Sequence, residues 1–177
     1  PREVALLVLH KVENEGAFSN LALNGELQKR NLTPLDKGLA TELVYGTLRN
    51  QGEIDYILSL FLTKPLSKLP LWILLILRLG LYQMRHMDKI PDSAAINESV
   101  KLAKKYGHQG TAGLVNGTLR NILRNPEKIV FPDRSENPAL HLSVCYSHPL
   151  WLIERWLREY GFDAAEKLCA YNNSGSK

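Results

Sequence analysis

Six lysines and arginines between residues 100 and 128 are the side chains with the clearest chemical potential in this sequence. Six basic groups against one glutamate give the segment a net charge of +5, whereas residues 1–99 carry eleven basic and eleven acidic side chains. Clustered ammonium and guanidinium groups attract a phosphate backbone, so the segment is a candidate nucleic-acid contact. A solvated helix face would carry the same charges. The six are Lys101, Lys104, Lys105, Arg120, Arg124 and Lys128.

The spacing of the three central lysines supports a shared role. Lys101, Lys104 and Lys105 fall at i, i+3 and i+4, which places them on one face of a helix. There they would act as point charges on phosphates and would not read base sequence. Tyr106 is the one aromatic residue between residues 100 and 128. The sequence therefore favours backbone contact over base stacking.

No set of side chains in the sequence forms a recognisable catalytic or metal-binding constellation. The five histidines do not fall at metal-ligand spacing with the two cysteines. Cys145 and Cys169 have apolar, helix-like neighbours, among which a thiol is usually a small core residue. Ser143 and His148 suggest a nucleophile and its base, but His148 directly precedes Pro149 and is expected at a helix start. We assign no catalytic, cofactor-binding or metal-binding residue.

Composition agrees with a folded protein that needs no cross-links. The chain has 177 residues, a formal charge of +4, 45% apolar and 23% charged residues, which excludes disordered and low-complexity classes. Two cysteines do not make a disulfide framework, so a reducing cytoplasm is the expected location. The longest apolar run, residues 71–77, is far below the roughly 20 residues that cross a bilayer, so no membrane association is expected.

The apolar periodicity is helical nearly throughout, and no run alternates as a strand would. Thr33 and Pro34 form a typical helix start, a hydroxyl cap followed by proline. Asp92 or Ser93 is expected to cap a later helix that ends at Gly107, and Asp163 with Glu166 resembles a capping box. These patterns predict an all-α fold, with helices over 2–15, 18–30, 33–50, 54–61, 71–84, 92–106 and 108–123.

The prolines at 126, 132 and 138 mark a change in organisation. Residues 1–128 are expected to form one domain and residues 129–137 a linker. Residues 138–173 are expected to form three shorter helices, followed by a polar tail over 174–177. Within these helices Trp151 and Trp156 are five residues apart, so one is expected to be buried and the other exposed.

An internal repeat links the first and second parts of the larger domain. Residues 43–50 and 114–121 are identical at seven of eight positions, 71 residues apart, which predicts two similar helical halves packed together. Gly46 and Gly117 are expected where another helix crosses closely. Arg49 and Arg120 occupy equivalent positions near the C-terminal ends of their helices, where a positive charge interacts favourably with the helix dipole. For Arg120, inside the basic segment, phosphate contact is the stronger interpretation.

Six short motifs in roughly the first 130 residues form a recognisable set: Gly16-Ala17-Phe18, the segment 43–49, Arg78-Leu79-Gly80-Leu81-Tyr82-Gln83, Ile90-Pro91, the segment 95–100 and the segment 115–120. Together they resemble the all-helical RNA-binding domain of the antitermination factor family NusB. Arg2 is a further candidate RNA contact on this resemblance, because it begins the N-terminal helix, although NusB proteins often carry several arginines there.

The continuation, Ser-His-Pro-Leu-Trp-Leu-Ile-Glu-Arg-Trp at 147–156, resembles the segment that joins a NusB-like domain to the catalytic domain of bacterial 16S rRNA cytosine-5 methyltransferases, the Sun or Fmu family. That resemblance implies a following domain that binds S-adenosylmethionine and attacks cytosine C6 with a Pro-Cys nucleophile. None of those motifs occurs in this chain. It is expected to bind or dock RNA, to be inactive alone, and to have 16S rRNA and its own catalytic domain as partners.

Two other functions stay open at this point. The chain could be a stand-alone antitermination-type RNA-binding factor, although such a factor does not need residues 137–173. It could also be a helical protein-interaction module with no RNA role, in which neutralising the basic segment would leave RNA affinity unchanged.

Overall fold

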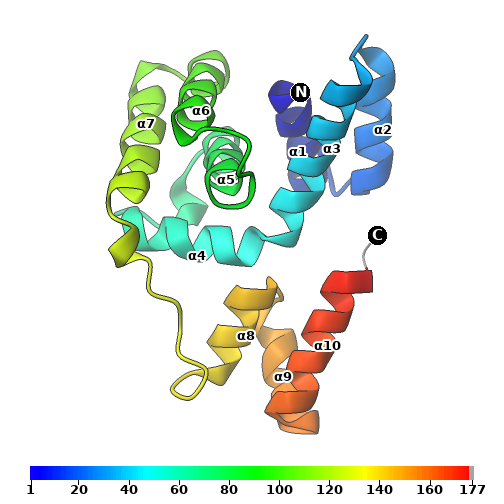
Figure 1. Ribbon diagram of the computed structural model, residues 1–177, viewed down its shortest axis with the longest axis vertical. Helices are drawn as coiled ribbons and strands as arrows, with labels where there is room; N and C mark the ends of the chain where they lie inside the picture. Colours follow the sequence, from blue (N-terminus) through cyan, green and yellow to red (C-terminus); the bar gives the residue numbers. More distant parts are fainter. Residues whose placement is uncertain (176–177) are drawn as a thin grey trace.

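The computed structural model describes residues 1–175, and the side chains of residues 1–173. Over that range the regular structure is ten α-helices and two short 3₁₀ turns, without a strand, which confirms the all-α prediction. Helices α1–α7 form a larger unit and α8–α10 a smaller one below it (Figure 1). The helices are α1 (Arg2–Glu15), α2 (Ser19–Lys29), α3 (Pro34–Arg49), α4 (Gln51–Phe61), α5 (Leu71–His86), α6 (Asp92–Tyr106), α7 (Gln109–Arg124), α8 (Pro138–Tyr146), α9 (Leu150–Tyr160) and α10 (Phe162–Gly175).

The helix starts agree with the sequence prediction at some positions and differ at others. Thr33 caps α3, since its hydroxyl oxygen accepts a hydrogen bond from the backbone N–H of Asp36 at 3.1 Å. The predicted cap at Asp92 or Ser93 is wrong because α6 already begins at Asp92. Asp163 likewise lies inside the first turn of α10, which begins at Phe162. Acidic residues in a first turn still complement the positive end of the helix dipole.

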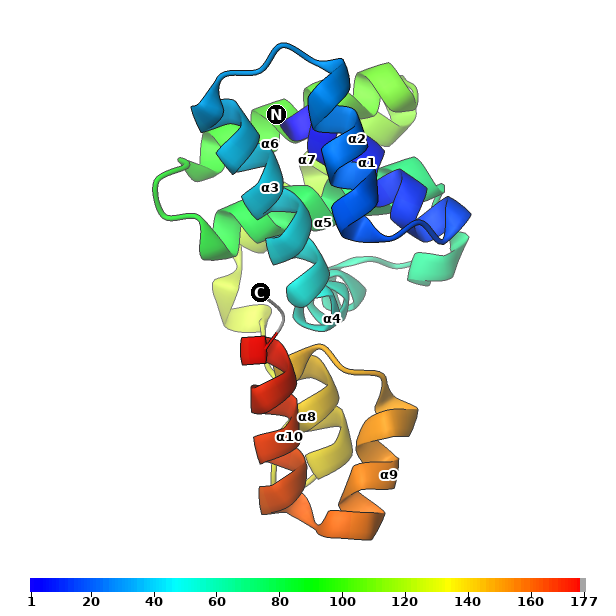
Figure 2. The same ribbon diagram turned by 90° about the vertical axis from the view of Figure 1, so that its right-hand side faces the viewer.

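Helix α5 is the centre of the larger unit. Every residue from Ile73 to Gln83 is buried, and α5 packs against α1, α3, α4, α6 and α7, which surround it in Figures 1 and 2. A helix that is apolar on all sides must be covered on all sides. The long apolar run of the sequence is thus core, and no helix within residues 1–175 is long and apolar enough to cross a membrane.

The repeat is used differently in its two copies. A Cβ added at Gly46 would overlap the ring of Tyr82 on α5, as a close crossing requires, whereas a Cβ at Gly117 would meet nothing within 4 Å. The expectation is therefore right for Gly46 and wrong for Gly117. Where α5 and α7 approach closely, the glycine is on α5 instead: a Cβ added at Gly80 would lie 2.8 Å from Leu119. The valine and the threonine are buried in both copies, but Leu43 is buried and Leu114 is exposed.

Helices α8–α10 have a separate small core, made of Leu142, Ile153, Ala165 and Cys169. Cys169 is buried as expected, but Cys145 is exposed, because its side of α8 lies outside this core. Trp156 packs partly buried against the core while Trp151 is 65% exposed, so one tryptophan is covered and the other is not. Helix α10 continues to Gly175, beyond the expected end at 173, and residues 176–177 lie outside the described residues.

Candidate nucleic-acid interface

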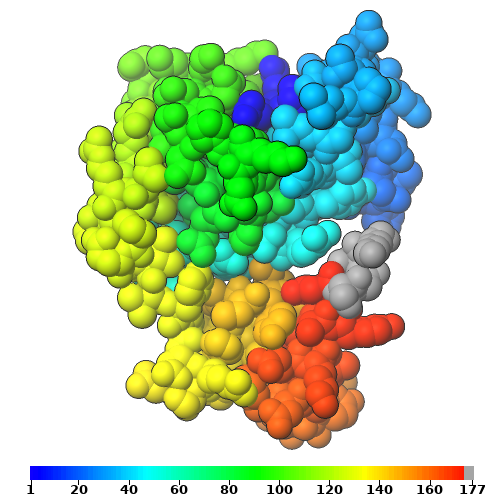
Figure 3. Space-filling model, in the orientation of Figure 1, coloured from blue at the N-terminus to red at the C-terminus, as the bar shows by residue number. Residues whose placement is uncertain are grey.

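Helices α6 and α7 pack side by side on the surface of the larger unit (Figures 1 and 3). They carry five of the six basic residues of the segment 100–128, and the sixth, Lys128, ends the short 3₁₀ turn after α7. Lys101, Lys104 and Lys105 are all exposed on α6. Lys101 and Lys105 line a groove of about 290 Å³ that also contains Arg2 and Glu3, from the start of α1. The fold thus brings the N-terminal candidate next to two of the lysines, 99 or more residues away in sequence.

A second groove, of about 450 Å³, lies on the other side of α6, between α6 and α7. Lys101 and Lys104 line it, together with Asn97, Glu98 and Asn116. The lysines therefore occupy one helix face, as predicted, but they serve two adjoining grooves. We call these two grooves and their lining residues the basic surface.

Arg120 borders the basic surface and is held in place by two asparagines. Its Nε donates to Asn116 Oδ1 at 2.9 Å, and one Nη donates to Asn97 Oδ1 at 3.4 Å. Arg124, one turn further along α7, is exposed and has no hydrogen bond or ion pair within the described residues. Arg120 is thus oriented before any ligand binds, which reduces the entropy that binding would cost.

Two carboxylates moderate the charge of the basic surface. Glu98 pairs with Lys101 at 3.3 Å and Glu3 with Lys105 at 2.6 Å. Hydrogen bonds from Lys105 and Tyr106 hold the pKa of Glu3 below its usual range. Lys104 has no such partner within the described residues, so its ammonium group is the most available for a phosphate.

Tyr106 does not offer its ring to a base. Its hydroxyl donates to Glu3 at 2.6 Å and its ring stacks on Trp72, with centroids 4.6 Å apart. Burial, followed by the bond to Glu3, raises the pKa of Tyr106 to about 12, so this hydroxyl stays a donor at neutral pH. The basic surface is suited to phosphates and ribose hydroxyls.

Arg2 has a structural contact as well as a place in the first groove. Its Nε donates to Gln83 Oε1 of the buried helix α5 at 2.7 Å. Its two Nη groups make no hydrogen bond within the described residues and remain available to a ligand.

The suspected catalytic groups are not arranged for catalysis. The hydroxyl of Ser143 donates to the backbone carbonyl of His148, and not to its ring. Partial desolvation by neighbouring side chains raises the pKa of the Cys145 thiol although the residue is exposed, and burial raises the pKa of Cys169 to about 11. Neither thiol is therefore an activated nucleophile. No group of three histidine, cysteine or carboxylate side chains in the described part of the chain could hold a metal ion.

Comparison with known proteins agrees with this helical architecture. The model of the NusB family matches residues 1–124. The chain belongs to the NusB family. It is 33% identical to the transcription antitermination protein NusB of Acetivibrio thermocellus, over 77% of this chain and 93% of that protein. A solved structure titled as antitermination factors NusB and NusE in complex with dsRNA is 26% identical, with a TM-score of 0.64, and covers 70% of this chain and 92% of that one.

Longer relatives match more of this NusB-family chain. The probable ribosomal RNA small subunit methyltransferase B of Bacillus subtilis is 47% identical over 95% of the chain, which corresponds to 37% of that protein. A methyltransferase with the same description from Synechocystis is 37% identical over 97% of the chain. A solved structure titled PH0851 covers 96% of the chain with a TM-score of 0.68 and 19% identity, and shows the fold alone. The chain spans less than two fifths of the length of these relatives.

Sequence reasoning missed the residues that complete the surface of this NusB-family domain. Asn97 and Asn116 orient Arg120, and Asn116 stands where the first copy of the repeat has Tyr45. That single mismatch in the repeat was the available signal. The cleft around Arg49 is lined by residues from four parts of the chain. No single motif contains all of them, so their meeting at one site left no signal in the sequence.

Proposed function

We propose that the chain is the RNA-binding, substrate-docking part of an S-adenosylmethionine-dependent 16S rRNA cytosine-5 methyltransferase of the cytoplasm. One observation carries this proposal. The similarity to the methyltransferases runs through 95–97% of the chain and so includes α8–α10, whereas the antitermination protein matches 77% and the family model ends at residue 124. Helices α8–α10 are therefore part of the similarity to the methyltransferases and lie outside the match to the NusB family model.

The basic surface is the part of the chain that would contact rRNA. It holds Arg2, Lys101, Lys104 and Lys105 in two adjoining grooves, with Arg120 and Arg124 on the neighbouring helix. Double-stranded RNA is recognised mainly through phosphates and ribose hydroxyls. Point charges and oriented N–H donors, without free aromatic rings, fit such contacts.

The methyl donor would bind elsewhere in the parent protein. S-adenosylmethionine supplies the methyl group when it is bound, but the described residues contain no strand and no glycine-rich turn after one, so they do not fit this cofactor. The chain alone should therefore be inactive.

The catalytic domain itself would be a partner of α9 and α10. Tyr160 and Tyr171 are exposed there and, with Trp156 and Leu168 among others, line a groove of about 670 Å³. Trp151 is a further exposed aromatic residue of α9. Large aromatic side chains gathered on a surface favour a protein contact.

RNA binding is tested by the salt dependence of affinity for a 16S rRNA transcript. Replacing Lys101, Lys104 and Lys105 with glutamine should lower the slope of log K against log salt by about 0.7 to 0.9 per lost phosphate contact. The matched control replaces three exposed lysines outside the basic surface, Lys37, Lys64 and Lys89. Equal slopes for both triple variants and the unmodified chain would overturn the assignment of this surface.

The enzymatic part is tested with tritiated S-adenosylmethionine and the same transcript. The full-length parent should label cytosine C5, and the 177-residue chain should label nothing. Label transferred by the chain alone, or no label transferred by the parent, would contradict the proposal.

A stand-alone antitermination-type factor is the second candidate, favoured by the match to 93% of an antitermination protein. The two candidates differ in what α8–α10 do. Removing residues 138–177 should leave the activity of a stand-alone factor intact, whereas it should uncouple a methyltransferase from its docking domain.

A further inference from the structure

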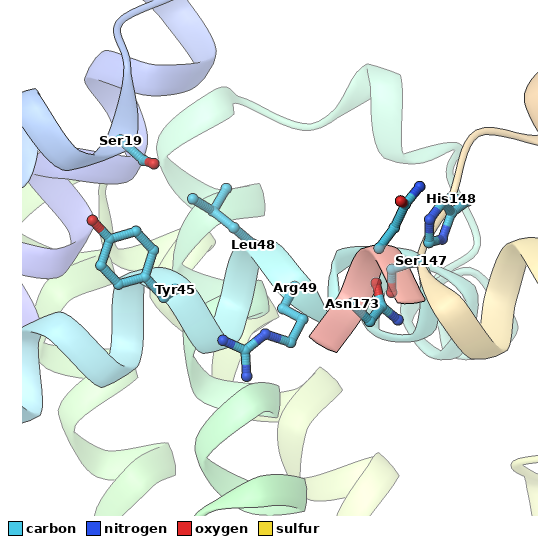
Figure 4. Close-up of a pocket in the computed structure, with 8 residues that line it drawn as sticks. Ser19, Tyr45, Leu48, Arg49, Ser147, His148 and Asn173 are labelled. Atoms are coloured by element: carbon cyan, nitrogen blue, oxygen red, sulfur yellow. The ribbon is translucent and has the colours of Figure 1, made fainter. Parts of the chain in front are cut away.

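A cleft of about 370 Å³ lies where the larger and smaller units meet. Figure 4 shows Ser19 and Tyr45 at one end, Ser147, His148 and Asn173 at the other, and Leu48 with Arg49 between them. The lining residues come from α2, α3, the turn between α8 and α9, and α10, where Asn172 completes them. Among the described residues no carboxylate lines the cleft, and Arg49 is the one charged side chain that does.

The Arg49 guanidinium is favourably placed for the α3 dipole, but no specific contact within the described residues fixes it. It makes no hydrogen bond or ion pair there, although it is at the C-terminal end of α3. The carbonyl of Gly46 in that last turn is already capped by the backbone N–H and the side-chain amide of Asn50, at 3.0 and 2.8 Å. Glu53, four residues on, is bound by Arg85 and His86. The equivalent Arg120, in contrast, is held by two asparagines.

The opposite wall of the cleft is held rigidly. Ser147 accepts a hydrogen bond from the backbone N–H of Gly52 at 3.1 Å. The carbonyl of Tyr146 accepts from Asn173 at 3.1 Å and contacts Nδ1 of His148 at 2.7 Å. With Nδ1–H donated to this carbonyl, the Nε2 atom of His148 is left as an acceptor. A rigid polar wall opposite an arginine that has no partner among the described residues is preorganised for a small polar anion.

We propose that this cleft binds one nucleotide of an unpaired RNA segment, with Arg49 contacting its phosphate; the proposal rests on the RNA-binding function above. A guanidinium is the side chain best matched to phosphate oxygens. The hydroxyls of Ser19 and Tyr45, the amide of Asn172 and His148 Nε2 supply donors and acceptors for a ribose or a base edge. The volume is at the small end of the range for small-molecule sites, which suits a single nucleotide and excludes a duplex.

The cleft is separate from the basic surface. Helices α2 and α3 lie on one side of the larger unit and α6 and α7 on the other (Figure 1). An RNA bound at both the basic surface and the cleft would contact the larger unit and the smaller unit at the same time. Its unpaired segment would then be fixed beside the last turns of α10, next to the point where the chain continues in longer relatives.

The test uses the 177-residue chain and a 12-nucleotide oligouridylate containing 4-thiouridine. Arg49→Gln should weaken binding about fivefold and lower the salt slope by about 0.7, the value for one phosphate contact on a single strand. Arg49→Lys should restore most of the slope, since it restores the charge. The matched control is Arg158→Gln, which removes an exposed arginine of α9 that has no partner within the described residues. Ultraviolet crosslinking should label peptides containing Tyr45 or His148.

Three results would overturn the proposal, and each differs from failure of RNA binding as a whole. One is equal affinity and slope for Arg49→Gln and Arg158→Gln. A second is a crosslink confined to α6 and α7. The third is loss of thermal stability of the full-length parent, but not of RNA affinity, in Arg49→Gln, which would assign the cleft to a protein segment. If the unmodified chain does not bind 16S rRNA at all, the proposed function itself fails.

Discussion

The backbone N–H of Gly52 donates to the hydroxyl of Ser147 at 3.1 Å, 95 residues away in the sequence. Gly52 is in the first turn of α4, and Ser147 ends α8 in a left-handed conformation with φ of 55°. Tyr56, one turn along α4, donates to the carbonyl of Val130 at 2.7 Å. Helix α4 is therefore the element of the larger unit that holds the smaller unit in place.

Replacing Gly52 with alanine should loosen this attachment. The new Cβ would lie 2.8 Å from Ser147 Cα and 3.0 Å from the carbonyl oxygen of Ser143, and backbone atoms cannot move aside cheaply. We expect a loss of about 1 to 3 kcal/mol in urea unfolding, typical of overpacking, and faster proteolysis between residues 129 and 137. Gly113→Ala is the matched control, since a Cβ there meets nothing within 4 Å and should stabilise α7 by up to about 1 kcal/mol. Equal stability of the two variants would contradict this account.

Asp55 should be essential for the fold of the larger unit. Both its carboxylate oxygens accept from Arg78, at 2.8 and 2.9 Å, and Arg78 is 5% exposed on the central helix α5. Asp55→Ala would leave a buried, uncompensated charge, and we expect a loss of about 3 to 5 kcal/mol in urea unfolding. Glu159→Ala, which breaks the exposed pair with Arg155, should cost at most about 1 kcal/mol. A loss of similar size in both variants would show that the Arg78 pair is not buried in solution.

Much of the fold could be predicted from sequence because local signals decide it. The Thr33-Pro34 start and the apolar run that begins at Leu71 each depend on a few adjacent residues, and both predictions are confirmed. The cap of α7 was not predicted, because it uses the ring of His108, which accepts from the N–H of Gly110, in place of a common capping residue.

The site could be predicted only in part, because its geometry depends on helix packing. The i, i+3, i+4 spacing predicts a shared face for the lysines, which α6 presents. The spacing cannot show that Arg2 lies in the same groove as Lys105, or that Glu3 pairs with Lys105, because α1 and α6 are about 100 residues apart in the sequence. The exposure of Gly117 could likewise not be predicted, because a repeat in the sequence does not specify which face of each copy is covered by other helices.

Glu26 should make stability depend on pH in the acidic range. Its side chain is 7% exposed and is surrounded by Lys11, Lys29 and Arg30. The hydrogen bond from Lys11 holds the pKa of Glu26 below its usual range, despite burial. A carboxyl with a lower pKa in the folded state adds stability that is complete above its unfolded pKa and is lost as pH falls through the folded value.

The measurement is urea unfolding of Glu26→Gln between about pH 6 and pH 3, the range over which carboxyl groups titrate. The variant should be less stable than the unmodified chain at pH 6, and the difference should shrink toward pH 3. Glu13→Gln, at an exposed carboxylate with no ion pair among the described residues, should leave the pH profile unchanged. A constant difference at every pH would mean that packing, and not charge, explains the loss.

Removing Glu98 should strengthen RNA binding. Glu98 is the carboxylate that lines both grooves of the basic surface, and it pairs with Lys101 at 3.3 Å. Glu98→Gln would remove a charge that repels phosphates and would release Lys101. We expect about a twofold to fivefold gain in affinity for a 16S rRNA transcript near 0.1 M salt, and a smaller gain at 0.5 M, where screening is stronger. Glu127→Gln changes the net charge equally but is outside both grooves, so it should have little effect. An equal gain in both variants would show that net charge alone governs binding. The assignment of the two grooves as the RNA contact would then be wrong.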